Sequence, residues 1–118
     1  MKVESQERQG VTIILVKQEE RADGWFAKSL RSLYQSLRTD DKRYVAVDLS
    51  GTEYIDSSCI SLLIEMLHNA LSLGGCLALA GLSNSTREIL KVTRLDRVIP
   101  VFMDIDSAVC ELSQGTSS

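Results

Sequence analysis

Short apolar runs alternate with segments of helical period from residue 11 to residue 112, and this alternation constrains the fold more than any other feature. The runs VTIILVK (Val11–Lys17), YVAVDL (44–49) and CLALAGL (76–82) are rich in aliphatic residues, so we expect buried strands there. A last strand is expected within 98–105, with Pro100 near its start at an edge position. Continuous apolar strands joined by crossover helices are typical of a mainly parallel sheet covered by helices.

The segments between these runs have the composition of helices and turns. From Phe26, large apolar residues recur at i, i+4, i+7 and i+8, which predicts an amphipathic helix that ends near Thr39. The polar start of the chain, residues 1–9, is predicted to add an edge strand, and SGTEYIDS (50–57) is predicted to be a loop. Further helices are predicted over 58–73, 85–93 and 106–112, with Ser83 or Asn84 capping the second and Asp106 capping the third.

The pattern therefore predicts one α/β domain, with a mainly parallel mixed sheet of four or five strands flanked by about four helices. A chain of 118 residues has the size of a single domain, and its 44% apolar content is sufficient for a modest core. We place the domain at residues 1–112 and a flexible C-terminal tail at 113–118.

Charge and cysteine content exclude several classes of partner and cofactor. The net charge of −3 and the pI near 5.1 argue against attraction to nucleic acid or to an anionic membrane. The three cysteines, at 59, 76 and 110, form no C-x-x-C pair, so neither a metal site nor a disulfide framework is expected. The polar N-terminus does not resemble a signal peptide, and every apolar run is far shorter than a membrane span. We expect a cytoplasmic protein without a cofactor.

Catalytic constellations are incomplete. Asp48, Glu53 and Asp56 form the densest acidic group, but a receiver-type phospho-acceptor site would also need a lysine after a later strand, and the strand at 76–82 lacks one. His68, the only histidine, lies about 15 Å along a helix from Ser58, too far for a catalytic pair. No glycine-rich phosphate loop is present in the sequence. We therefore expect binding to other proteins rather than enzymatic activity.

The segment Asp56-Ser57-Ser58 leaves a strand and opens a helix, and two interpretations of it carry equal weight. One of these residues could simply be the helix N-cap. Alternatively, an exposed hydroxyl there could accept a phosphate, which the helix N-terminus tolerates and which adds nearly two negative charges to an acidic surface. Such a charge would block docking of a partner.

The stretch VAVDLSGTEYIDSSCISLL, followed by LGGCLALAGLSNSTREILKVTRLDRVIPVFMDIDSAV, resembles the STAS domain of bacterial anti-sigma factor antagonists. The resemblance is close over residues 44–112 and looser over 11–38. It implies phosphorylation of Ser58, with Ser57 as the second candidate. It also implies that an anti-sigma factor serine kinase binds the unphosphorylated protein and that a metal-dependent serine phosphatase reverses the modification. The partner-binding residues expected from it are Asp56, Ser57, Ser58, Cys59 and Ile60. We expect a monomer or a weak dimer.

Two residues depart from the family pattern, which has glycine where this chain has Cys59 and Arg94. A glycine after the acceptor serine allows close approach of another backbone, so Cys59 is expected to narrow the set of kinases that dock. These departures keep open an alternative function: a STAS scaffold subunit of a larger signalling or transporter complex that is not phosphorylated.

Overall fold

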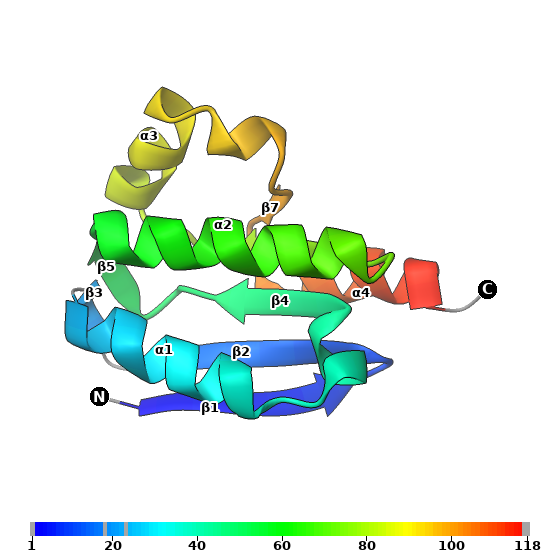
Figure 1. The fold of residues 1–118 in the computed structure, drawn as a ribbon. Coiled ribbons are helices and arrows are strands. Elements are labelled where there is room, and N and C mark those ends of the chain that lie inside the picture. The colour runs from blue at the N-terminus through cyan, green and yellow to red at the C-terminus, as the bar shows by residue number, and fades with distance from the viewer. Residues whose placement is uncertain (1, 18, 23, 117–118) are drawn as a thin grey trace.

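The computed structural model describes residues 2–17, 19–22 and 24–116, and it contains a central sheet with helices on both faces (Figure 1). The central sheet has five strands in the order β1-β2-β4-β6-β7, and a separate sheet pairs β3 with β5. The strands are β1 (Lys2–Arg8), β2 (Val11–Lys17), β3 (Glu19–Ala22), β4 (Tyr44–Asp48), β5 (Thr52–Ile55), β6 (Cys76–Ala80) and β7 (Val101–Phe102).

The central sheet is mainly parallel, as predicted. Among the described strands of this sheet, only β1 runs antiparallel to its neighbour, β2. Strand β1 lies at the edge of the sheet, which confirms the predicted edge strand at the start of the chain. The pairs β2–β4, β4–β6 and β6–β7 are all parallel. In this register Ile14 lies opposite Val47, and Val47 opposite Leu79, so aliphatic residues line up across neighbouring strands.

Helices cover the sheet unevenly. Figure 1 shows α1 and α2 side by side on one face, α4 on the opposite face and α3 beyond the edge of α2. The helices are α1 (Gly24–Ser36), α2 (Ser57–Ser72), α3 (Asn84–Val92) and α4 (Ile105–Thr116), with short 3-10 turns η1 (Thr39–Lys42) and η2 (Leu95–Arg97). Helix α2 ends at Ser72, one residue before the predicted end; Leu73 is its C-cap, and Gly74 follows with φ +80, a conformation that favours glycine.

The period-2 alternation of the strands sorts their side chains into two cores. On the face under α1 and α2 the strands contribute large aliphatic residues, such as Val45 and Val47 of β4. On the face under α4, β4 and β6 contribute the alanines Ala46, Ala78 and Ala80, whereas β2 contributes the larger Val11 and Ile13. The alanines on that face let α4 pack close to the sheet through Ala108 and Val109.

The segment 50–57 is not a loop throughout, contrary to the prediction, because it contains β5. This strand pairs in parallel with β3, so Glu19 lies opposite Thr52 and Ala22 opposite Ile55. Ile55 is 1% exposed and fixes β5 to the core under α1 and α2, which we call the main core. The two strands stabilise each other through pairing over a long sequence separation, which turn-forming composition alone does not reveal.

The last helix also differs from the prediction. Its cap lies two residues earlier than expected, at Asp104 rather than Asp106: the Ser107 amide donates to Asp104 Oδ1 at 2.8 Å, and the helix begins at Ile105. Asp106 instead forms an ion pair with Arg8 of β1 at 2.6 Å. The helix continues to Thr116, so residues 113–116 of the predicted flexible tail are helical, and 117–118 lie outside the described residues. The preceding strand, β7, is only two residues long.

Candidate docking site at the start of α2

The turn after β4 is held tightly against the turn after β6. The Leu49 amide donates to the carbonyl oxygen of Ala80 at 2.9 Å, and the Ser50 amide donates to Asp48 Oδ1 at 3.0 Å. Gly81 has φ +70, and a Cβ on it would lie 2.8 Å from the Cβ of Ser50, so only glycine fits there. Asp48 is therefore part of the turn that directs the chain into β5.

Asp56 caps helix α2, as one of the two interpretations predicted. Its backbone is extended, with φ −101 and ψ −178, and its Oδ1 accepts a hydrogen bond from the Cys59 amide at 3.1 Å. The Asp56 carbonyl accepts from the Ile60 amide at 3.1 Å and starts the helical hydrogen-bond ladder. These two bonds fix the backbone of the first helical turn.

The first turn of α2 separates its residues into exposed and buried ones. Ser57 and Ser58 are both exposed, whereas Cys59 is 0% exposed and lies in the main core. Ile60 is half-buried and packs against the same core. A partner docking on this conformation thus meets the two hydroxyls and not the Cys59 thiol, so direct contact through Cys59 does not fit this structure. The assignments of the other four residues stay predictions.

A second helix start lies beside the first one. Ser83 caps α3, because its Oγ accepts from the Thr86 amide at 3.1 Å, and the same hydroxyl donates to the carbonyl oxygen of Glu53 at 2.5 Å. This bond ties α3 to β5, and Figure 1 shows β5, the start of α2 and α3 at one end of the molecule. Between the turn after β4 and the turn after β6 is a hollow of about 310 Å³, lined by Ser50, Gly51, Thr52, Glu53, Gly81 and Ser83.

The sequence predicted only a cap at Ser83 or Asn84 and did not indicate the hydrogen bond from Ser83 to Glu53 of β5. One further residue of the hollow was missed: Thr52 is 3% exposed, and its hydroxyl has no hydrogen-bond partner among the described residues. Both the Ser83–Glu53 bond and the burial of Thr52 depend on β5, a strand that the sequence did not predict.

The acidic residues near the site do not form a metal centre. Within the described ranges, no group of three or more histidine, cysteine, aspartate or glutamate side chains is arranged to hold a metal ion. His68 is exposed on α2, ten residues beyond Ser58 and therefore about 15 Å along the helix. The described helices also include none that is both long and apolar enough to cross a membrane.

Comparisons with known proteins agree with this architecture. The family model of the STAS domain matches residues 2–108. A protein of Thermotoga neapolitana, provisionally named an anti-sigma factor antagonist, is 31% identical over 64 residues. That match covers 54% of this chain and 57% of the relative, so it spans little more than half of either protein.

Solved structures show the same fold. A crystal structure from Thermotoga maritima, provisionally described as an anti-sigma factor antagonist, superposes with a TM-score of 0.83 at 22% identity and covers 93% of both chains. The Bacillus cell fate determinant SpoIIAA in its phosphorylated form superposes with a TM-score of 0.70 at 12% identity, covering 93% of this chain and 98% of that one.

The chain is a STAS-type α/β domain. Its class is defined by the five-stranded mixed sheet, the turn after β4, the parallel pair β3–β5 and the capped start of α2. With the family match over residues 2–108, the chain belongs to the STAS domain family. The resemblance found in the sequence is thereby confirmed, and the relatives named above are anti-sigma factor antagonists by description.

Proposed function

We propose that this protein is a cytoplasmic anti-sigma factor antagonist that acts by binding and has no catalytic group of its own. In its unphosphorylated form it binds an anti-sigma factor that is also a serine kinase, and it is released when Ser58 is phosphorylated. A metal-dependent serine phosphatase then restores the binding form. The descriptions of the Thermotoga relative and of phosphorylated SpoIIAA support this class of function.

The observation that carries the proposal is the exposure of Ser58 on a helix turn whose backbone is fixed independently of its side chain. Asp56 caps the turn and Cys59 anchors it in the core, so neither contact depends on the Ser58 hydroxyl. A kinase therefore meets an exposed hydroxyl, and a phosphate on it leaves both contacts in place.

Electrostatics explain how such a phosphate separates the partners. The positive end of the helix dipole makes a phosphate at this position compatible with the fold. The same phosphate adds nearly two negative charges to a surface that already carries Asp56, on a chain of net charge −3. A partner that docks over this helix start must then desolvate the phosphate, which opposes binding.

Incubation of the chain with its cognate anti-sigma kinase and ATP, followed by mass-spectrometric site mapping, tests the assignment. We expect one phosphoserine, at Ser58. The substitution Ser58→Ala should abolish phosphorylation, whereas Ser57→Ala should leave it unchanged. Ser61→Ala is the matched control, because Ser61 is also an exposed serine of α2. If Ser58→Ala is phosphorylated at the rate of the parent chain, Ser58 is not the acceptor. A phosphate mapped to Ser57 would then make Ser57 the acceptor, and a phosphate elsewhere would refute the switch. A complete lack of phosphorylation, with stable recovery in a large assembly, would favour the scaffold-subunit alternative.

A further inference from the structure

The end of α3 and the following η2 turn carry charge of the opposite sign to that of the whole chain. Residues 87–97 contain four cations (Arg87, Lys91, Arg94 and Arg97) and two carboxylates (Glu88 and Asp96), a net charge of +2 in a chain of −3. All six of these side chains are exposed. A positive region on an acidic protein attracts negatively charged partners over roughly a Debye length.

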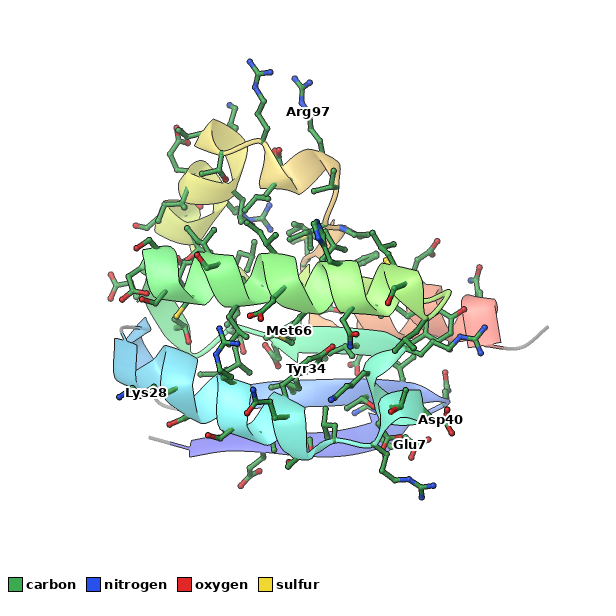
Figure 2. All side chains as sticks on the ribbon, viewed as in Figure 1. Glu7, Lys28, Tyr34, Asp40, Met66 and Arg97 are labelled. Carbon is green, nitrogen blue, oxygen red and sulfur yellow. The ribbon has the colours of Figure 1, made fainter. Side chains whose placement is uncertain are left out.

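Exposed apolar side chains lie within the same stretch of chain. Val92 is 74% exposed at the end of α3, and Val98 is 56% exposed just after η2. Figure 2 shows Arg97 projecting away from the body of the protein beyond α2. Among the side chains that the structure describes, neither Arg94 nor Arg97 forms an ion pair, so both are available to a partner.

A groove of about 340 Å³ runs between α3 and the β7 end of the sheet. Buried Leu82 and Leu90, with half-buried Val101, give it apolar walls, while Arg87 and Lys91 place cations on it. Among the described residues that line the groove, Asp96 is the one carboxylate. Such a groove suits a short segment that places an apolar side chain between its walls and acidic side chains next to the cations.

The backbone at Arg94 is unusual for its residue type. Arg94 follows the helix end with φ 63 and ψ 17, in the left-handed region, and its amide donates to the Lys91 carbonyl at 3.1 Å. This conformation costs a non-glycine residue about 1 kcal/mol, and glycine is the residue usually found at this position after a helix. The chain instead keeps an exposed cation there, which is consistent with a use for the guanidinium outside the fold.

We propose that the α3–η2 surface, formed by Arg87, Lys91, Val92, Arg94, Arg97 and Val98, is a second docking site that binds an acidic amphipathic segment of a partner protein. The apolar groove and the two exposed valines favour a peptide with both carboxylates and aliphatic side chains over the uniformly charged backbone of a nucleic acid.

This surface is distinct from the proposed switch. The Ser83 end of α3 is tied to β5 near Ser58, whereas Arg94 lies just past the opposite end of this nine-residue helix, which is about 13 Å long. One partner could therefore remain bound at the α3–η2 surface while another is released at Ser58. The inference stands whether or not Ser58 is phosphorylated.

An NMR titration of the isotope-labelled full chain tests the proposal. The ligand is a short synthetic peptide with glutamates and leucines in helical spacing. We expect amide shifts concentrated in residues 87–98. Arg97→Glu should weaken binding about fivefold, and Arg94→Gly, which relieves the backbone strain, about threefold without loss of folding. Arg38→Glu, the same charge reversal at an exposed arginine before η1, is the matched control and should leave affinity unchanged.

Three further ligands separate the possible occupants. A peptide with serines in place of the leucines should bind at least several-fold more weakly, and equal binding would overturn the amphipathic partner. Tighter binding of single-stranded DNA or of phosphatidylglycerol vesicles than of the acidic peptide would also overturn the proposal. Shifts spread evenly over the surface, or an equal loss in Arg38→Glu, would refute it. Ser58→Glu should bind the peptide as the parent does, so failure of the switch and failure of this site are distinguishable.

Discussion

Asp56 Oδ1 accepts a hydrogen bond from the Cys59 amide at 3.1 Å, and this contact fixes the helical turn on which Ser57 and Ser58 are exposed. The carboxylate replaces a hydrogen bond that the helix itself cannot supply at its first turn. The N-cap and the switch interpretations of this segment are therefore compatible, because Asp56 is the cap and the serines remain available.

Removal of the cap should loosen the turn without unfolding the domain. We expect Asp56→Ala to lower the free energy of unfolding by about 1 kcal/mol, and Asp56→Asn to lower it by less, since an asparagine oxygen also caps a helix. Urea denaturation followed by circular dichroism measures both changes. Equal stability of Asp56→Ala and the parent chain would show that the hydrogen bond does not stabilise α2.

Thr52 offers the opposite kind of change. Its buried hydroxyl has no partner among the described residues, whereas its amide donates to the Leu49 carbonyl at 2.9 Å through the backbone. Thr52→Val keeps the shape and the backbone bond and removes the unsatisfied group, so we expect stability to rise by about 1 kcal/mol. Thermal unfolding measures the effect, with Thr52→Ser as the control that retains the hydroxyl. A clear loss of stability in Thr52→Val would indicate a partner for the hydroxyl.

Arg94 should be replaceable by glycine at no loss of stability. Glycine adopts the left-handed conformation without strain, although it has more entropy in the unfolded chain, so we expect Arg94→Gly to be neutral or more stable by up to about 1 kcal/mol. Arg94→Val should be destabilised instead, because a β-branched residue is poorly tolerated at φ 63. The order of the three melting temperatures checks the prediction, and a valine variant as stable as the glycine variant would contradict it.

The cap of α4 should titrate in acid. Two hydrogen bonds from Ser107 lower the pKa of the exposed Asp104 carboxyl: the one from its amide has the larger effect, and the one from its side chain the smaller. Because the folded pKa lies below the unfolded value of about 3.9, the stabilisation is fully present above that value and is lost as pH falls through the folded pKa. Asp104→Ala should therefore have a lower melting temperature than the parent at neutral pH, with a smaller difference in strong acid.

Asp106→Ala is the control for this pair, since the sequence alone had assigned the cap to Asp106. It removes an exposed ion pair with Arg8 and should change stability less than Asp104→Ala at neutral pH. The reverse order would show that the cap is Asp106 after all.

The sequence predicted the elements that have a clear hydrophobic period, such as β2 and α2, because burial of one face determines both the period and the fold. It missed β3 and β5, whose polar and charged residues are held by pairing with each other, with partners such as Glu19 and Thr52 lying 33 positions apart in the chain. The choice between Asp104 and Asp106 was also beyond it, because the ion pair of Asp106 with Arg8 depends on the packing of α4 against the sheet.

For the site, the local pattern was sufficient to place Asp56, Ser57 and Ser58 at a helix start, because capping follows short-range rules. Local pattern did not reveal that Ser83 bonds to Glu53. This bond depends on how α3 packs against β5, a strand distant in the sequence.

The most direct test of the central claim is calorimetric binding of the cognate anti-sigma factor to the chain carrying phosphoserine at Ser58 and to the unmodified chain. We predict that the phosphate weakens binding at least about a hundredfold, from the charge and desolvation that it adds at the docking surface. Phosphoserine at Ser61 should have a much smaller effect. Equal affinity of the unmodified and Ser58-phosphorylated chains would contradict the switch.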